Sequence, residues 1–255
     1  MRKSTDSVFI QVTGLHKELG GQHIHRGVDI SVFEGETLVL LGASGEGKSV
    51  FLKQLLGLMR PTSGSIVIDG LEVSHLPERE LDDVRRKMGI LFQGGALFDS
   101  MDVAENVAFP LREHGEKDQA VIAKRVHECL DAVDLAADKH KLPDSLSGGM
   151  RKRVALARAM VSNPRCILYD EPTAGLDPVV SDSINKLIRR IQERLGVTSV
   201  VVTHDMKSAN QIADRIAYLR HGKIYFVGTP EEFQAQAEKD RVIGDFVEGR
   251  SREES

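Results

Sequence analysis

The N-terminal part of the chain alternates apolar and polar residues over short stretches, which is the pattern of half-buried β-strands. Residues 8–12, 28–32 and 65–69 show this alternation, and turns rich in glycine, proline and serine separate them, including Gly20 and Gly21. Strands that follow one another through short turns usually pair in opposite directions. The pattern therefore predicts an antiparallel sheet at the N-terminal edge of the fold.

The middle of the chain changes from alternation to helical periodicity. Residues 37–41 form a continuous apolar run that ends in glycine, and residues 48–58 then have the periodicity of a helix. From about residue 97 to residue 160 the pattern stays helical, and residues 121–133 carry apolar side chains three or four positions apart. We expect a strand, a loop and a helix, followed by an inserted helical lobe.

The C-terminal third returns to an alternation of strands and helices. Residues 167–169 and 199–202 have the apolar character of buried strands, and residues 181–195 between them have helical periodicity. A strand-helix-strand order predicts a parallel sheet, because the helix returns the chain to the edge where the next strand begins. A hairpin at residues 216–227 and a helix that starts after Thr229 complete the predicted elements.

Composition and charge exclude several classes of protein. The chain has 255 residues, 41% of them hydrophobic, which is enough to bury a substantial core. Its net charge is −4 with both signs spread along the chain, so we expect no nucleic-acid partner, since such proteins normally carry a basic patch. Cys129 and Cys166 lie far apart in sequence, which favours two buried thiols over a disulfide or a zinc site.

The apolar runs are short throughout. None approaches the ~20 residues that a membrane-spanning helix needs, and residues 1–6 lack the apolar core of a secretory signal. We therefore expect a cytoplasmic protein that does not itself cross a membrane.

The clearest chemical motif is the glycine-rich segment of residues 42–49. It fits the pattern G-x-x-x-x-G-K-[ST], in which backbone N–H groups surround phosphates, a lysine reaches the β- and γ-phosphates and a hydroxyl binds Mg²⁺. A flexible turn is the alternative, which the position between a strand and a helix disfavours. We expect the side chain of Glu46 to point away from the phosphates into solvent. The candidate ATP-binding residues of this segment are Gly42, Ala43, Ser44, Gly45, Glu46, Gly47, Lys48, Ser49 and Val50.

A pair of carboxylates follows the strand predicted at residues 167–169. Asp170 suits the coordination of Mg²⁺, and Glu171 suits a base that orients the attacking water. Parallel strands present such residues at the edge of the sheet where ligands bind. An acidic strand end by itself is more often solvated surface, and only the phosphate motif upstream favours the catalytic interpretation.

A second candidate anion site precedes a strongly helical run. Ser147, Gly148 and Gly149 stand at the start of the helix predicted from about residue 150, where N–H groups and the positive end of the helix dipole attract anions. A well-capped helix without a ligand explains the same residues equally well. The residues alone leave both interpretations open.

Taken in order, these motifs resemble the nucleotide-binding subunit of ABC transporters. The resemblance covers roughly residues 8–230 and implies ATP and Mg²⁺ as cofactors. It rests on six motifs: the phosphate loop at 42–49, the Q-loop glutamine Gln93, the signature at 146–150, the second Walker motif at 170–171, the D-loop at 174–177 and the switch-histidine motif at 203–205.

The resemblance also implies a fold. It would be an α/β P-loop NTPase with a RecA-like parallel-sheet core, an N-terminal antiparallel β subdomain and an inserted helical subdomain. A single ABC ATPase domain would occupy residues 8–245, with the core at 8–95 and 163–245 and the helical subdomain at about 96–162. Residues 246–255 would form a polar tail.

Roles for individual residues follow from the same resemblance. Gln93 would touch Mg²⁺ and sense a membrane partner, and His204 would hold the γ-phosphate. The signature residues would bind the γ-phosphate of the opposite subunit in a head-to-tail homodimer. The implied catalytic residues are Glu171, His204, Lys48 and Gln93, the metal ligands are Ser49, Gln93 and Asp170, and the further ATP-binding residues are Leu19, Val28, Ser147, Gly148, Gly149 and Asp177.

The chain departs from the family pattern at two positions. Met150 stands where the signature usually ends in glutamine, and Leu19 stands where an aromatic residue normally stacks on adenine. Stacking on an aromatic side chain contributes about 1–3 kcal/mol, so its absence weakens nucleotide binding unless apolar contacts such as Val28 compensate.

Within the family, residues 91–101, 106–113 and 146–153 are similar to the ATPases of Mla and Mce systems, which move phospholipids or other lipids across the bacterial envelope. This implies a peripheral protein at the cytoplasmic face of the inner membrane, partnered by a permease, an Mce-type lipid-binding protein and an accessory subunit. Phe98, Asp99 and Met101 would lie beside the groove that receives a short permease helix. The alternatives are an ATPase for another solute, such as an amino acid or a metal, and a soluble ABC ATPase outside transport.

Overall fold

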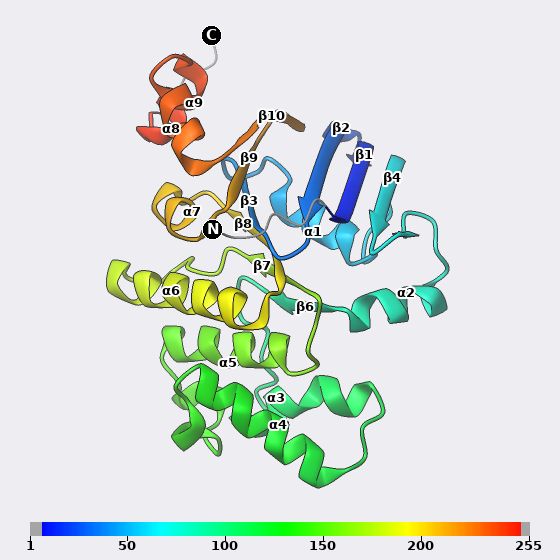
Figure 1. Cartoon of the computed structure of the whole chain (residues 1–255), viewed down its shortest axis with the longest axis vertical. Coiled ribbons are helices and arrows are strands. Elements are labelled where there is room, and N and C mark those ends of the chain that lie inside the picture. Colours follow the sequence, from blue (N-terminus) through cyan, green and yellow to red (C-terminus); the bar gives the residue numbers. More distant parts are fainter. Residues whose placement is uncertain (1–6, 251–255) are drawn as a thin grey trace. The chain divides into compact units, whose positions relative to one another are not determined.

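The computed structural model describes residues 7–250, so the expectations for residues 1–6 and 251–255 fall outside the described part of the chain. The chain divides into two compact units, one of residues 7–74 with 202–250 and the other of residues 75–201 (Figure 1). The expected division into a core and a helical subdomain is a different partition of the chain and stays a prediction.

The first unit contains the predicted antiparallel sheet. Strands β1 (Val8–Leu19), β2 (Gln22–Phe33), β4 (Ser63–Ile68) and β5 (Leu71–Glu72) pair in the order β2-β1-β4-β5. The strands β1 and β2 are longer than the alternation predicted, because irregularities in their register interrupt the pattern without ending the pairing. The residues of β1 that point into the core, Ile10, Val12 and Leu15, have no exposed surface.

A second group of strands in this unit includes the strand that directly precedes the phosphate-loop segment. Strand β3 (Thr37–Leu41) runs parallel to β9 (Arg215–Arg220), which forms an antiparallel hairpin with β10 (Lys223–Gly228). Helix α1 (Lys48–Leu55) follows β3 and is shorter than expected, because Gly57 adopts a positive φ of 65° soon after the helix ends. The expected strand-loop-helix order and the expected hairpin are both confirmed.

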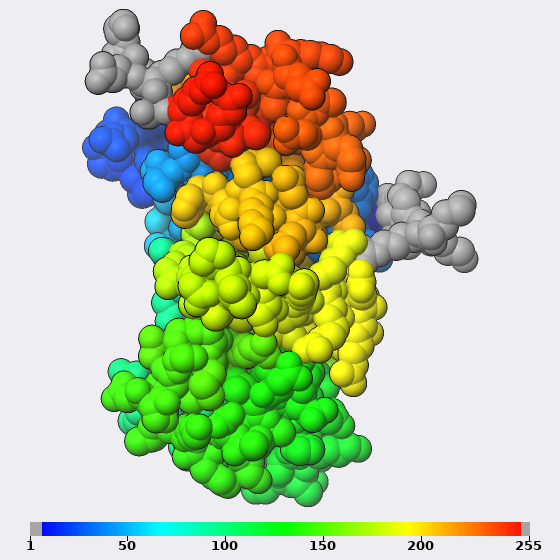
Figure 2. All heavy atoms as spheres, turned by 90° about the vertical axis from the view of Figure 1, so that its left-hand side faces the viewer, coloured from blue at the N-terminus to red at the C-terminus, as the bar shows by residue number. Residues whose placement is uncertain are grey.

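Three short helices complete the first unit: α7 (Met206–Ile212), α8 (Pro230–Ala237) and α9 (Arg241–Val247). Helix α8 begins with the expected capping box, in which the N–H of Glu232 donates to Thr229 Oγ1 (3.2 Å) and the N–H of Thr229 donates to Glu232 Oε2 (2.8 Å). The ring of Tyr218 on β9 packs against Phe233 of α8 and Phe246 of α9. Figure 2 shows these two helices, coloured orange to red, as one continuous surface.

The second unit has three strands and five α-helices among its described residues. Strands β6 (Met88–Leu91), β7 (Cys166–Asp170) and β8 (Thr198–Thr203) lie in the order β8-β7-β6, and β8 runs past the end of the unit. Strands β6 and β7 are parallel. The parallel sheet predicted from the strand-helix-strand order concerned β7 and β8, which are neighbours in the sheet. The helices are α2 (Glu78–Arg86), α3 (Val103–Glu113), α4 (Gln119–Ala132), α5 (Gly148–Met160) and α6 (Pro178–Leu195).

Helix α5 is the centre of the second unit. It packs against α3, α4, α6 and β6, and Figure 1 shows it between α6 on one side and α3 and α4 on the other. Its contact with β6 is close, because a Cβ added at Gly89 would lie 2.1 Å from the carbonyl oxygen of Ala159. The sequence predicted the helical lobe but not α2 or β6, since α2 is mostly charged and β6 has only four residues.

Both cysteines are free and buried, as the sequence favoured, and burial raises the pKa of the Cys129 thiol to about 11. Among residues 7–250, no helix is both long enough and apolar enough to span a membrane.

Candidate functional site

The phosphate-loop segment connects the end of β3 to the start of α1. Gly45 and Gly47 have φ angles of 87° and 94°, which side-chain-bearing residues rarely adopt. A Cβ at Gly47 would also lie 2.5 Å from Ile24 Cγ2, and one at Gly42 would lie 2.7 Å from the carbonyl oxygen of Leu219. The backbone conformation therefore requires glycine at positions 45 and 47, and the lack of space for a side chain requires it at positions 42 and 47.

Two charged side chains of this segment turn inward. The Lys48 ammonium is buried and donates to the carbonyl oxygens of Gly42 (2.8 Å) and Ala43 (2.9 Å), so it lies across the loop that precedes it. The expectation that Glu46 points into solvent is wrong: its side chain is only 17% exposed, and Oε1 lies 4.0 Å from Nδ1 of His221. The imidazole of His221 gives this carboxylate a polar neighbour on the protein surface.

The other site residues predicted in this unit differ in exposure. Leu19 is 37% exposed at the end of β1, whereas Val28 on β2 has no exposed surface. Of the two, Leu19 is the side chain that a base can reach. His204 is exposed and directly precedes Asp205, whose side chain caps α7 by accepting from the N–H of Lys207 (3.0 Å).

In the second unit, Lys152 of α5 connects two of the predicted catalytic residues. Its ammonium donates to the backbone carbonyls of Gln93 and of Glu171, the latter at 3.2 Å. Burial lowers the pKa of Lys152, and the negative charges of Asp170 and Glu171 oppose that effect. Sequence reasoning missed this residue, because a lysine inside a basic helical run gives no sign of which carbonyls it reaches.

The backbone at Glu171 is strained. Its φ of 46° lies in the left-handed region, where a side-chain-bearing residue costs about 1–3 kcal/mol, and the residue as a whole is 9% exposed. Asp170 before it ends strand β7 and is half-buried. The bond from Lys152 to the Glu171 carbonyl is one of the contacts that hold this conformation.

The turn after Gln93 is held in the same way. Gly95 and Ala96 both have positive φ angles, 78° and 48°, and the guanidinium of Arg158 donates to both of their carbonyls at 2.7 Å. Burial lowers the pKa of Arg158, which nevertheless stays charged because a free guanidinium titrates far above neutral pH. Two basic residues of α5 thus fix the segment that carries the Q-loop glutamine.

The signature segment packs directly on the start of α6. Ser147 caps α5, with its Oγ accepting from the N–H of Met150 (3.3 Å). A Cβ at Gly149 would lie 2.6 Å from Val180 Cγ1, and one at Gly148 would lie 3.2 Å from Leu176 Cδ2. Ser147 itself is exposed at the helix N-terminus, so the capped-helix and anion-site interpretations both fit the geometry.

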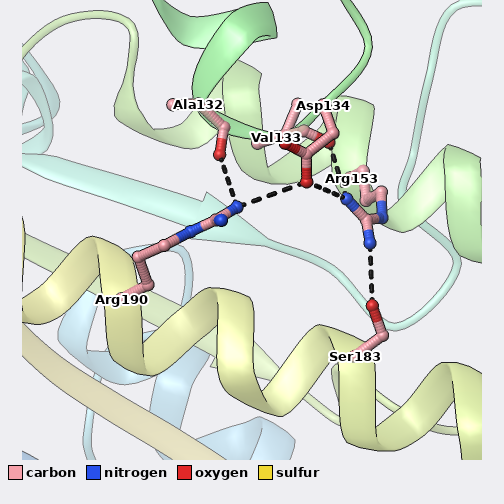
Figure 3. A network of polar contacts seen from close by, with 6 residues as sticks. All are labelled: Ala132, Val133, Asp134, Arg153, Ser183 and Arg190. Atoms are coloured by element: carbon pink, nitrogen blue, oxygen red, sulfur yellow. Dashed lines mark hydrogen bonds and ion pairs between the residues drawn. The ribbon is translucent and has the colours of Figure 1, made fainter.

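A network of polar contacts connects α4, α5 and α6 in the second unit (Figure 3). Its centre is the Asp134 carboxylate, which accepts from Arg153 (2.9 Å) and Arg190 (3.3 Å). The two guanidinium groups also donate to the C-terminal end of α4 and to α6, at Val133 O, Ala132 O and Ser183 Oγ. The network fixes the end of α4 against the two helices whose N-termini carry Ser147 and Asp177.

These groups fit Mg-ATP. The glycines of the first unit leave a backbone cradle that side chains would fill, and Lys48 supplies a cation beside it. Residues 7–250 contain no cluster of three or more His, Cys, Asp or Glu side chains placed to hold a metal ion. Mg²⁺ in nucleotide sites needs no such cluster, because one or two protein oxygens and the phosphates bind it. The hydroxyl of Ser49 in the first unit and the carboxylate of Asp170 in the second unit are each oxygen ligands of the kind that Mg²⁺ prefers.

Comparison with known proteins agrees with these observations. The family model for the ABC transporter matches residues 25–174. The protein named "Probable ribonucleotide transport ATP-binding protein mkl" of Mycobacterium tuberculosis is 44% identical over 243 residues, 95% of this chain and 67% of that protein. The intermembrane phospholipid transport system ATP-binding protein MlaF of Haemophilus influenzae is 39% identical over 243 residues, 95% of this chain and 91% of that protein.

Solved structures show the same fold. A dimeric ATP-binding cassette in a post-hydrolysis state, bound to ADP and Pi, is 34% identical with a TM-score of 0.79, covering 87% of this chain and 98% of that one. A subunit of the cbiONQ transporter complex of Clostridium perfringens is 30% identical with a TM-score of 0.84, covering 93% and 95%. The chain therefore belongs to the ABC transporter family, as an ATP-binding subunit of the MlaF and Mkl type that hydrolyses ATP with Mg²⁺.

Proposed function

We propose that this subunit powers the movement of phospholipid across the bacterial envelope through a separate permease. The 39% identity to the phospholipid transport protein MlaF supports the lipid cargo. The groove beside the Q-loop segment supports docking on a permease. This groove has a volume of about 440 Å³ and is lined largely by apolar residues, among them Met88, Ile90, Phe92, Phe98, Phe109 and Pro110. An amphipathic helix of a partner would bury its apolar face in such a groove.

Phe98 is the residue of this groove best placed to contact a partner. Its side chain is 40% exposed, and its ring centroid lies 4.6 Å from that of Phe109. The buried side chain of Asn106 fixes the backbone of Phe98: it accepts from the N–H of Phe98 (2.8 Å) and donates to the carbonyl of Phe98 (3.1 Å). The ring is therefore presented by a rigid segment, together with Asp99 and Met101.

The partners and the location follow from the proposed function. Two copies of the chain form a head-to-tail homodimer, with Ser147, Gly148 and Gly149 of each copy facing the γ-phosphate held by the other. The dimer docks on the permease at the cytoplasmic face of the inner membrane, with an Mce-type protein and an accessory subunit carrying the lipid. The structures of similar cassettes as dimers support the first of these steps.

Roles within the nucleotide site are part of the proposal. Residues 42–50 hold the phosphates, while Ser49, Asp170 and Gln93 are the residues that would hold Mg²⁺, which would supply positive charge beside the phosphates. Glu171 orients and polarises the attacking water, His204 contacts the γ-phosphate, Asp177 approaches the nucleotide and Leu19 lies at the adenine. Lys152 donates to the backbone carbonyls of both Gln93 and Glu171, which supports placing these two residues in the same site.

Replacing Glu171 by Gln tests the site. The substitution leaves the phosphate and Mg²⁺ contacts intact but removes the base, so steady-state ATP hydrolysis should fall by about 10²- to 10⁴-fold while ATP stays bound. Size-exclusion chromatography with Mg-ATP should then show a stable dimer. Near-normal turnover of this variant would remove Glu171 from the proposed role.

The docking proposal is tested with Phe98→Ala and with Val121→Ala as a matched control, since Val121 is 48% exposed but does not line the groove. Tagged full-length chain is purified from solubilised membranes, and the complex is reconstituted in vesicles. The Phe98→Ala variant should still bind ATP, but it should no longer co-purify with the permease, or its ATP hydrolysis should no longer be stimulated in the reconstituted complex. The Val121→Ala variant should behave like the wild type. Recovery of the chain only with ribosomes or DNA would contradict a role in transport.

Ribonucleotide is the second candidate cargo, because the mycobacterial relative with that printed name is 44% identical. Relatives named for methionine and putrescine transport are 43% and 40% identical over shorter stretches. Stimulation of ATP hydrolysis by added phospholipid supports the lipid cargo. Stimulation by a ribonucleotide, an amino acid or a polyamine, with no response to phospholipid, overturns the cargo and leaves the docking proposal standing.

A further inference from the structure

A buried polar pair lies beneath the phosphate loop. His25 of β2 has no exposed surface, and its Nε2 lies 3.2 Å from the carbonyl oxygen of Gly47. Its Nδ1 lies 2.8 Å from Oε1 of Gln54, which is also buried. Gly47, Phe51 and Gln54 are spaced along one face of the start of α1, and the His25 ring lies along that face, nearly perpendicular to the ring of Phe51 (86° between the ring planes).

The position of the ring depends on Gly47. A Cβ there would lie 3.0 Å from Nε2 of His25, so the absent side chain is what lets the imidazole approach the loop. The carbonyl that it meets already accepts the N–H of Phe51 (2.9 Å), the first hydrogen bond of α1. A carbonyl oxygen has two lone pairs, and His25 can therefore add a second bond to the same group.

The charge state of the ring follows from its surroundings. Burial lowers the pKa of His25, and the hydrogen bonds to Gln54 and Gly47 only partly oppose this. The neutral ring has one N–H, yet oxygen atoms face both of its nitrogens. The Nε2 group of Gln54 has no hydrogen-bond partner among the described residues.

A half-turn of the Gln54 amide resolves the conflict. The amide nitrogen then donates to Nδ1 of His25, and the single N–H of the ring lies on Nε2, directed at the Gly47 carbonyl. In this arrangement Nδ1 of the ring accepts one hydrogen bond and the N–H at Nε2 donates another, so both ring nitrogens have a partner. Gln54 therefore sets the tautomer that the contact with the phosphate loop requires.

We propose that His25, with its tautomer set by Gln54, is a positioning residue for ATP binding that fixes the peptide between Gly47 and Lys48. In a trans peptide the C=O of one residue and the N–H of the next point in opposite directions. Holding the Gly47 carbonyl toward β2 therefore directs the Lys48 N–H away from it. Lys48 is the first residue of α1, and N–H groups at a helix start are those that bind phosphate. This inference rests on the proposed role of residues 42–49.

Affinity measurements on the full-length chain test the inference. His25→Phe keeps a ring but loses the donor, and it should weaken binding of ATP and of free triphosphate equally, by roughly 2- to 10-fold, as expected for one hydrogen bond. His25→Gln keeps a donor near the position of Nε2 and should recover most of this loss. Gln54→Leu removes only the group that sets the tautomer and should have a smaller effect of the same kind.

The matched control is His16→Phe, because Nδ1 of His16 also lies 2.8 Å from a glycine carbonyl, that of Gly14, on an exposed part of the same sheet. It should leave both affinities unchanged. Unfolding midpoints of all variants separate a loss of binding from a loss of folding. Equal loss in His25→Phe and His25→Gln, or no loss in His25→Phe, would overturn the inference.

Nitrogen NMR of the wild-type chain gives a readout that needs no substitution. The expected result is a neutral His25 with its proton on Nε2, whereas a proton on Nδ1 or a doubly protonated ring contradicts the inference. Lys48→Ala separates this inference from the proposed site. If Lys48→Ala retains triphosphate affinity, the assignment of the phosphate loop fails. If that variant loses affinity and His25→Phe does not, only the role of His25 fails.

Discussion

The phosphate loop and the signature helix are held in place by different kinds of contact. Lys48 reaches carbonyls five and six positions away, and the glycines of its own segment set the shape of the loop. Two basic residues of α5 instead reach carbonyls far away in sequence: Lys152 contacts Gln93, 59 positions away, and Arg158 contacts Gly95, 63 positions away. The glycines and the lysine of the phosphate loop set most of its shape, with His25 as a contact from β2, whereas the placement of Gln93 and Glu171 depends on the packing of α5.

Substitutions in the two regions should therefore change different quantities. A change near the phosphate loop alters the affinity for nucleotide, because the contacts there are made by the segment that would bind it. A substitution of Lys152 or Arg158 alters the placement of the Gln93 and Glu171 segments. It should therefore lower the turnover rate more than it lowers the affinity for ATP. Substitutions at Lys152 and Leu19 test this contrast directly, and one at Asp134 tests the stability of the helices around α5.

Lys152→Met should have the largest effect. Methionine fills a similar volume but leaves the carbonyls of Gln93 and Glu171 without the ammonium, and hydrogen bonds to a charged group contribute about 1.5–3 kcal/mol each. We expect kcat to fall by about 10- to 100-fold with a change in ATP affinity of less than about 3-fold. Lys186→Met, on an exposed lysine of α6, is the control. Equal losses of kcat and affinity would remove the contrast between the two regions.

Leu19→Tyr should have an intermediate effect, confined to nucleotide affinity. Leu19 is 37% exposed, so a tyrosine there gains only part of the stacking free energy, and ATP should bind about 5-fold more tightly. Affinity for free triphosphate should not change, because the triphosphate has no base. Titration of both ligands against both proteins decides the matter. An unchanged or weaker affinity for ATP means that the adenine lies elsewhere.

Asp134→Asn should have the smallest effect, a loss of at most about 1 kcal/mol of unfolding free energy, because the carboxylate is 62% exposed and solvent screens its ion pairs. Asparagine tolerates the positive φ of 61° at this position, so only the charge is tested. Hydrogen bonds from Arg153 and Arg190 lower the pKa of Asp134 in the folded state.

The sign of the pH dependence follows from this lowered pKa. The ion pairs stabilise the folded state at every pH above the unfolded pKa of about 3.9, and the benefit disappears as the pH falls through the lower folded value. The difference between wild type and Asp134→Asn should therefore be constant from about pH 7 to pH 5 and vanish in stronger acid. Urea unfolding at several pH values measures it, and a difference that grows in acid would contradict the assignment.

Several elements could be predicted because their signals are local. The apolar run of β3, the glycines of residues 42–49 and the capping box at Thr229 each lie within a few neighbouring residues. Helix α2 and strand β6 could not be predicted, since one has only Leu81 and Val84 buried and the other has too few residues for a period. The helix predicted after the phosphate loop, residues 48–58, is longer than α1, because the positive φ of Gly57 is incompatible with a continuing helix.

The motifs, their order and the family are predictable without coordinates, since they depend on residue types at fixed spacings along one segment. Folding decides which carbonyls Lys152, Arg153 and Arg158 reach and that His25 meets Gln54 beneath Gly47. The physical reason is that a buried cation or imidazole takes its partners from whatever segment packs beside it. That choice is made by the three-dimensional contacts of strands and helices, and no spacing along the chain records it.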